Sequence, residues 1–148
     1  MADTDEVHTG RCYCGASTVS APGAPLVVSY CHCEDCRRVT GAPVGAFAAW
    51  APGNLTLTPS DLGTISVAKG VERWFCPKCG SPLAARWDYL PDQIYVPVGV
   101  MDRPEVLEPS RHAHAAERLP WLHLADELPR AERSARDGLN AAAAGCDG

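Results

Sequence analysis

The 148-residue sequence lacks any apolar run long enough to cross a membrane, because its hydrophobic stretches are short and interrupted by proline or glycine. It also lacks an excess of basic residues, since 13 Lys and Arg stand against 18 Asp and Glu, a formal net charge of -5 at pH 7. This balance argues against non-specific binding to nucleic acid or to an anionic membrane surface. The length predicts a single domain with a core large enough to fold without disulfide staples.

A basic, apolar secretion signal is also missing, because Met1 to Glu6 are acidic and polar. We therefore expect a cytoplasmic protein, a compartment in which thiols stay reduced. This expectation bears on the eight cysteines of the chain. In a reducing compartment, clustered cysteines favour metal ligation over a disulfide framework.

The densest cluster is Cys31-His32-Cys33-Glu34-Asp35-Cys36, with three thiols in six residues. A thiolate is a soft, strong zinc ligand, and three protein ligands leave one tetrahedral position free. That open arrangement is typical of catalytic zinc, whereas four ligands close a structural site. We predict a catalytic zinc on Cys31, Cys33 and Cys36, with His32 pointing away from the metal between two ligands that point toward it.

Two further pairs of cysteines, each followed by glycine, flank this trio in the sequence. They are a C-x-C pair, Cys12 and Cys14, and a C-x-x-C pair, Cys76 and Cys79. Tight pairs of this kind wrap a metal, and two pairs distant in sequence can close one tetrahedral site. We predict a second, structural zinc here, two ions per chain in all. Its binding would contribute directly to folding.

Spacing alone leaves other arrangements open. One joins the C-x-C pair to the first two thiols of the trio: Cys12, Cys14, Cys31 and Cys33. Another makes both sites structural by completing the trio with one of four histidines: His8, His112, His114 or His123. The last cysteine, Cys146, has no partner pair and is interpreted as a free thiol.

Short β-branched and apolar segments separated by turn residues predict a mainly β protein. Strands are expected over 17–20, 26–30, 43–50, 55–58, 64–68, 72–76, 82–87, 93–99 and 111–117, with Pro97 suggesting an edge strand. A helical turn is expected over 35–40, and an amphipathic segment packed on the sheet over 119–128. Residues 1–9 are predicted to be a flexible leader, 10–129 a single zinc-binding domain, and 130–148 a poorly ordered tail.

Several motifs together resemble a known family. They are Gly10-Arg11-Cys12-Tyr13-Cys14-Gly15, then Cys31-His32-Cys33-x-x-Cys36-Arg37 with Thr40-Gly41, then Phe75-Cys76-x-x-Cys79-Gly80-x-x-Leu83. Weaker matches are Gly99-x-x-Asp102-x-Pro104 and His112 nine residues before Trp121. These features resemble the glutathione-dependent formaldehyde-activating enzyme family, which also includes centromere protein V. The resemblance runs from about Gly10 to Pro129.

The resemblance implies a β-tent fold of antiparallel sheets clasped by zinc, with little helix. It also implies the division of ligands argued above, with a structural zinc on the two pairs and a catalytic zinc on the trio. Members of the family act as carbon–sulfur lyases or as S-(hydroxymethyl)glutathione synthase. The domain over 10–129 is accordingly expected to be of the formaldehyde-activating enzyme type.

An open zinc site, taken together with this resemblance, predicts an enzyme that acts on a sulfur-containing substrate. Our hypothesis is that the trio site binds a small-molecule thiol or thiol–aldehyde adduct and makes or breaks a C–S bond. No nucleic-acid or membrane partner is expected, and a homo-oligomer is left open. Arg37 and Arg38 are candidates for neutralising the thiolates or attracting an anionic substrate.

Two other functions compete with this one. The first is a zinc-stabilised module for protein interaction. The resemblance permits this function, as centromere protein V shows. The second is a zinc hydrolase, which needs a general base near the metal. The candidates for such a base are Glu34, Asp35 and His112.

Overall fold

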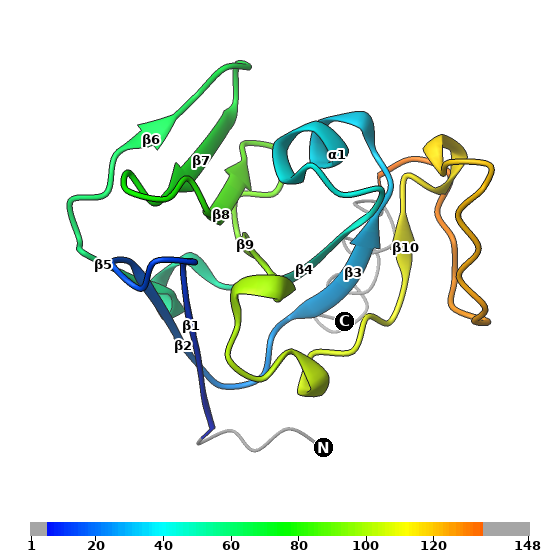
Figure 1. Ribbon diagram of the computed structural model, residues 1–148. Helices are drawn as coiled ribbons and strands as arrows, with labels where there is room; N and C mark the ends of the chain where they lie inside the picture. The colour runs from blue at the N-terminus through cyan, green and yellow to red at the C-terminus, as the bar shows by residue number, and fades with distance from the viewer. Residues whose placement is uncertain (1–5, 135–148) are drawn as a thin grey trace. The chain divides into compact units, whose positions relative to one another are not determined.

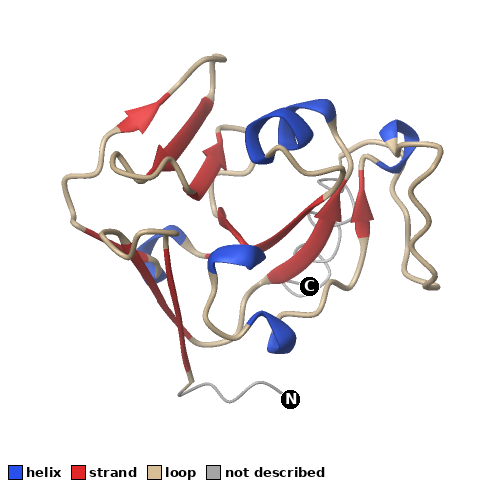
Figure 2. Ribbon diagram, viewed as in Figure 1, coloured by secondary structure: helices blue, strands red, loops and turns tan. Residues whose placement is uncertain are grey.

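The computed structural model describes residues 6–134, and more of these residues lie in strands than in helices (Figures 1 and 2). The mainly β class with little helix is confirmed. The described strands are β1 (Val7–Arg11), β2 (Thr18–Pro22), β3 (Val27–Cys31), β4 (Gly45–Trp50), β5 (Thr56–Thr58), β6 (Thr64–Ile65), β7 (Val71–Phe75), β8 (Pro82–Trp87), β9 (Ile94–Pro97) and β10 (His112–Ala113). The helices are α1 (Glu34–Thr40) and the 3-10 turns η1 (Pro52–Asn54), η2 (Val98–Val100), η3 (Pro104–Val106) and η4 (Ala115–Glu117).

The described chain divides into two compact units, each built from segments that are distant in sequence. The first contains residues 6–28 and 46–109, and the second contains 29–45 and 110–134. The two cysteine pairs belong to the first unit and the cysteine trio belongs to the second. Each candidate metal site is therefore positioned by one unit alone.

The first unit contains two antiparallel arrangements of strands. In one, the order is β1-β2-β5; in the other, it is β4-β9-β8-β7-β6. The core lies among these strands and is centred on large, fully buried side chains such as Trp50, Leu83, Val96 and Leu107. The hairpin β7–β8 presents Cys76 and Cys79 at its turn, between the two strands expected over 72–76 and 82–87.

Strand β1 begins at Val7, inside the range that was expected to be a leader. Its side chains alternate between exposed and buried, but the buried ones are His8 and Gly10, and the apolar Val7 is exposed. The strand therefore carries no hydrophobic alternation that a sequence pattern could detect. His8 packs against Trp50, with ring centroids 5.7 Å apart.

The prediction that Pro97 marks an edge strand is wrong. Strand β9 lies between β4 and β8, and Pro97 stands opposite Phe47 as the last residue of β9. A terminal proline removes no hydrogen bond from the middle of the ladder, so an inner strand tolerates it there.

Close approach of backbone makes Gly10 a sensitive position. Gly10 bridges to Met101, and a Cβ on Gly10 would lie 2.6 Å from the Val100 carbonyl oxygen. Because a backbone oxygen cannot move aside cheaply, we expect Gly10→Ala to destabilise the protein by about 1–3 kcal/mol. The urea midpoint of unfolding measures this change. Gly63→Ala is the matched control, since a Cβ at Gly63 meets nothing within 4 Å; equal midpoints for the two variants would contradict the prediction.

The second unit is organised by the parallel pairing of β3 with β10, where Tyr30 stands opposite His112 and Cys31 opposite Ala113. The strand expected over 111–117 is shorter than predicted, because His114 adopts a left-handed conformation with φ 54° and η4 follows it. Helix α1, in contrast, covers the predicted helical turn and ends at Gly41, whose φ is 73°.

The prediction of an amphipathic segment packed on the sheet over 119–128 is corrected. Residues 119–128 form no regular element in the described structure, and Trp121 is 64% exposed. Pro120 and Pro129 disfavour helical backbone at Leu119 and Leu128, the two ends of the segment. The first residues of the expected tail lie beside β10: the backbone N–H of Ala131 donates to the carbonyl of His112 at 3.0 Å, and the backbone N–H of His114 donates to the carbonyl of Arg133 at 2.7 Å. Residues 135–148, including Cys146, lie outside the described residues.

Candidate metal centres

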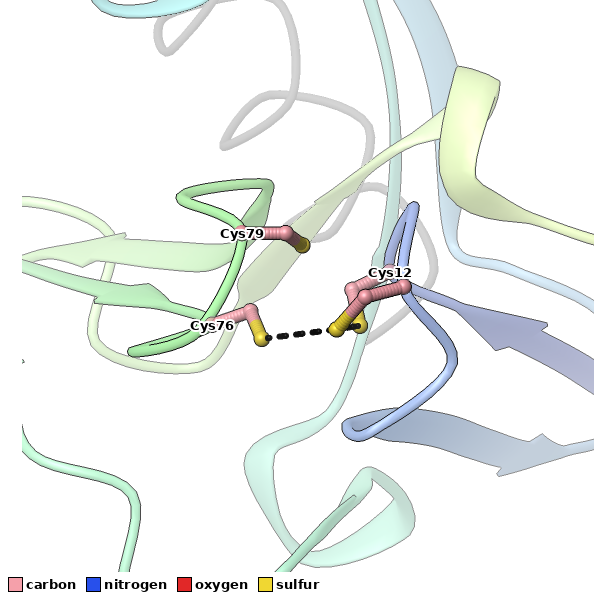
Figure 3. Close-up of side chains that lie close together, drawn as sticks. Cys12, Cys76 and Cys79 are labelled. Carbon is pink, nitrogen blue, oxygen red and sulfur yellow. Dashed lines mark hydrogen bonds between the residues drawn. The ribbon is translucent and has the colours of Figure 1, made fainter.

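The first candidate centre is a cluster of four sulfurs in the first unit. Cys12 and Cys14 follow β1, and Cys76 and Cys79 occupy the turn between β7 and β8. The four Sγ atoms all lie within 4.8 Å of one another. Figure 3 shows that the sulfurs of the two turns face one another.

The spacing of these sulfurs fits a tetrahedral zinc site. Ligands about 2.3 Å from a zinc ion at tetrahedral angles lie about 3.8 Å from one another. The Sγ atoms of Cys12 and Cys14 are 3.6 Å apart, and those of Cys14 and Cys76 are 3.8 Å apart. Two of the sulfur–sulfur distances are thus at the spacing of a tetrahedral site, and the group of four thiols is compact enough to hold a metal ion.

Hydrogen bonds hold the two turns to each other and to their sulfurs. The backbone N–H of Tyr13 donates to the Ser81 hydroxyl at 3.0 Å, so one turn is tied to the other. The hydroxyl of Ser81 lies 3.2 Å from the Sγ of Cys79 and lowers the pKa of Cys79 to about 5. In the other turn, the N–H of Ser17 donates to the Sγ of Cys12 at 3.2 Å. Such bonds favour thiolates, which are the form that binds metal.

The second candidate centre is the trio in the second unit. Cys31 ends β3, Cys33 is the N-cap of α1, and Cys36 lies in its first turn and is 4% exposed. The Sγ atoms of Cys31 and Cys33 are 3.5 Å apart, close to the tetrahedral spacing, and all three sulfurs fall within one 4.8 Å cluster. The strand-to-helix turn thus gathers three ligands because the N-cap side chain must turn toward the first turn of the helix.

Hydrogen bonding within the trio favours a thiolate on Cys33 over thiolates on Cys31 and Cys36. Hydrogen bonds from the Cys31 and Cys36 thiols, with the N–H of Cys36 at 3.2 Å, lower the pKa of Cys33 to about 2. The thiols that donate these bonds hold their protons, and the pKa of Cys31 is raised to about 12. The pKa of Cys36 is also raised, first by its hydrogen bond with Cys31.

Metal binding at the trio must therefore displace two protons, those of Cys31 and Cys36. Because both thiols have raised pKa values, protons compete with the metal throughout the neutral range. We expect the zinc affinity of this site to fall as pH falls, by about a hundredfold per pH unit for two protons. Calorimetric zinc titration in buffers of different ionisation enthalpy counts the protons released.

Cys33→Ser identifies the part of this proton release that belongs to the trio. The wild type is expected to release about two protons more than the variant when both are saturated with zinc. Equal proton release by the two proteins would contradict this description of the trio. A zinc affinity that stays the same between about pH 6.5 and about pH 8.5 would contradict it too.

Among residues 6–134, none of the four histidines considered as a fourth ligand belongs to the cluster of the trio, although His114 is near enough to act electrostatically on Cys33. Within residues 6–134, the cluster around the trio contains no fourth cysteine, histidine or carboxylate. His8 packs on Trp50, His114 lies 3.3 Å from a carboxylate oxygen of Glu117, and His123 is exposed. His112 is engaged at both ring nitrogens, by Asp126 and by His32.

The contact between His112 and Asp126 is the part of the second unit that sequence reasoning missed. The Nε2 of His112 lies 3.0 Å from a carboxylate oxygen of Asp126, and its Nδ1 lies 2.8 Å from the Nε2 of His32. No motif links an aspartate to a histidine fourteen residues earlier in a segment without regular structure. His32, which the sequence places between two ligands, is buried with its ring turned to His112.

The three candidates for a general base of a zinc hydrolase are poorly suited to that role. Glu34 forms an ion pair with Arg38 at 2.8 Å, and Asp35 is exposed. His112 has no ring nitrogen left to accept a proton from water. Arg37 differs from Arg38, because its buried Nε has no hydrogen-bond partner among residues 6–134.

With seven thiols gathered into a group of four and a group of three, the comparison with known proteins becomes specific. Residues 7–117 match the family described as glutathione-dependent formaldehyde-activating enzyme. The chain belongs to this family. The resemblance found in the cysteine motifs is therefore confirmed, and the match includes both clusters, His32 and His112 but ends before Asp126.

Two relatives extend the comparison. Over 76 residues, the chain is 30% identical to a Schizosaccharomyces pombe protein named as an uncharacterized lyase, and the match covers 51% of this chain and 55% of that relative. The chain thus spans about half the length of the curated relative. A crystal structure of a Rhodobacter sphaeroides protein is similar in fold, with a TM-score of 0.53, 21% identity, and coverage of 83% of this chain and 99% of that one. Among the described residues, no helix is long and apolar enough to span a membrane.

Proposed function

We propose that this member of the formaldehyde-activating enzyme family is a zinc-dependent carbon–sulfur lyase that acts on a small thiol or a thiol–aldehyde adduct. Adducts of the S-hydroxymethyl type, including that of glutathione, belong to this class of substrate. The observation that carries the proposal is the grouping of three sulfurs with no fourth ligand side chain among residues 6–134. The family match and the lyase name of the yeast relative support the same reaction class.

The donor sets of both clusters suit zinc, because four thiolates make a closed structural site and three leave one position for a substrate. Cys12, Cys14, Cys76 and Cys79 would hold the structural ion, and Cys31, Cys33 and Cys36 the catalytic one. When bound at the trio, zinc supplies a site that lowers the pKa of a substrate thiol.

The reaction proposed for this site is the reversible cleavage of a hemithioacetal. In the lyase direction the C–S bond breaks, the hydroxyl group loses its proton as the carbonyl forms, and the sulfur leaves as a thiolate that is then protonated. The chain contributes the three thiolates that place the substrate sulfur. The guanidinium of Arg37, one residue after Cys36, has no hydrogen-bond partner for its Nε among the described residues and would attract an anionic thiol.

The partner expected from this chemistry is a small-molecule thiol rather than nucleic acid or a membrane. The seven described cysteines are free thiols. A site that depends on thiolates works in a reducing compartment, so we propose a cytoplasmic location.

The direct test combines zinc analysis with a screen of thiol–aldehyde adducts. Wild-type protein is expected to bind two zinc ions and to turn over at least one adduct, whereas Cys33→Ser is expected to lose one zinc and the turnover. Equal zinc content and equal turnover in the two proteins would sink the proposal. If the wild type binds two zinc ions but turns over no adduct, the interaction module is the better reading.

A further inference from the structure

Three side chains of the second unit form a continuous hydrogen-bonded chain that ends beside the cysteine trio. The carboxylate oxygens of Asp126 lie 3.1 and 3.0 Å from the Nε2 of His112. The Nδ1 of His112 lies 2.8 Å from the Nε2 of His32. Both imidazole rings are 1% exposed, so water does not compete for these bonds.

The carboxylate fixes the direction of the first bond. The backbone N–H of Leu128 donates to Asp126 at 3.0 Å, and Arg130 lies 3.0 Å from the same carboxylate. An ionised carboxylate only accepts hydrogen bonds, so the Nε2 of His112 must carry the hydrogen. In the neutral form of His112, Nδ1 accepts a hydrogen bond and the Nε2 of His32 donates it. Asp126 thereby determines which nitrogen of His32 carries the proton, through the ring of His112.

Within residues 6–134, the ring of His32 makes one hydrogen bond, the bond to His112. The other ring nitrogen of His32, Nδ1, is buried and has no hydrogen-bond partner among residues 6–134. The ring is stacked on His112, with centroids 5.1 Å apart, and His112 is stacked in turn on Tyr30, with centroids 4.8 Å apart. The bond to His112 is therefore the one polar contact in the described structure that holds the His32 ring.

Fixing the His32 ring also restricts its two neighbours, Cys31 and Cys33, which are candidate metal ligands. His32 lies between Cys31 and Cys33, and its backbone N–H donates to the Ala113 carbonyl at 3.1 Å. With backbone and ring both fixed, the chain from Cys31 to Cys33 has little freedom to turn either sulfur away. We propose that Asp126, through His112, fixes the direction of hydrogen bonding and the orientation of His32, and that Asp126 and His112 are positioning residues of the trio site.

The test uses Asp126→Asn, whose amide has nearly the same shape but can donate a hydrogen bond. The amide is expected to donate to the Nε2 of His112, which moves the hydrogen of each ring to Nδ1. Nitrogen NMR of the zinc-loaded full chain reads the protonated nitrogen of each ring directly. In the wild type we expect hydrogen on Nε2 of His112 and His32, and in Asp126→Asn on Nδ1 of both.

The positioning role predicts a change at the metal site as well. We expect Asp126→Asn to lower the zinc affinity of the trio or the kcat of adduct turnover by about 10- to 100-fold, the usual effect of losing an outer partner of a metal site. KM is expected to change by less than about threefold, since the variant removes no group that touches the substrate. The matched control is Glu127→Gln, which makes the same change of charge at the exposed neighbouring residue; it is expected to leave all three quantities unchanged.

The activity arm rests on the proposed function, but the NMR and zinc-affinity arms do not. If the wild type turns over no adduct, the lyase proposal fails, but the hydrogen-bonded chain from Asp126 to His32 can still be tested. The proposed role of Asp126 and His112 is overturned if wild-type His112 carries hydrogen on both ring nitrogens. It is equally overturned if Asp126→Asn leaves the ring hydrogens of His112 and His32 on the same nitrogens as in the wild type. It is also overturned if the zinc affinity and kcat of Asp126→Asn equal those of Glu127→Gln. The wild-type spectrum decides the hydrogen-bond direction even if the variant fails to fold.

Discussion

Replacing Cys79 by serine is expected to lower the melting temperature by more than about 10 °C, because the four-thiol site then loses its closure. Zinc at a structural site contributes about 10–16 kcal/mol in small domains, as much as the whole stability of a typical domain. In this chain the site joins the turn after β1 to the turn between β7 and β8, with sulfurs 3.8 Å apart across the two turns. Without the metal, the remaining contact between the turns is weak, resting on bonds such as that from Tyr13 to Ser81.

Thermal unfolding followed by circular dichroism measures this effect, and a chelator should reproduce it in the wild type. Cys146→Ser is the control, since it removes a thiol that belongs to neither pair in the sequence, and its melting temperature is expected to stay within about 2 °C of the wild type. If Cys79→Ser melted like Cys146→Ser while the wild type held zinc at this site, the ion would not be structural.

The cysteine trio and each of the two cysteine pairs could be predicted from sequence because their geometry is local. Cys31, Cys33 and Cys36 are separated by so few residues that a strand end and one helical turn must bring their sulfurs together. The glycines after each pair, with φ of 82° at Gly15 and 78° at Gly80, mark turns that the backbone could not make with most other residues. Strand β8 was likewise predicted with its observed limits.

What the sequence did not reveal depends on contacts between distant segments. Asp126 meets His112 because residues 129–133 pair with the backbone around β10, and neither segment has a periodic pattern that would indicate this. The amphipathic spacing around Trp121 suggested packing against the sheet, yet the side chain is largely exposed. Strand β1 was missed for a related reason, since a buried histidine and a glycine occupy its inward positions.

Replacing Cys36 by serine is expected to have the opposite profile to Cys79→Ser. A serine hydroxyl is a poor zinc ligand, so the trio would retain two thiolates and its affinity for the metal would fall. We expect adduct turnover to drop by at least about 100-fold, equivalent to about 2.7 kcal/mol of transition-state stabilisation. The assay is kcat/KM of zinc-loaded protein, with zinc content measured on the same samples.

The effect of Cys36→Ser on stability should be modest. The side chain is 4% exposed and lies in the first turn of α1, so burying a hydroxyl there costs about 1–3 kcal/mol if it finds no partner. That cost is small beside the loss expected for Cys79→Ser. Because the two substitutions are chemically identical and differ only in the cluster they disrupt, equal melting temperatures would contradict the division into one structural and one catalytic site. A variant that lost neither zinc nor turnover would show that Cys36 is not a ligand.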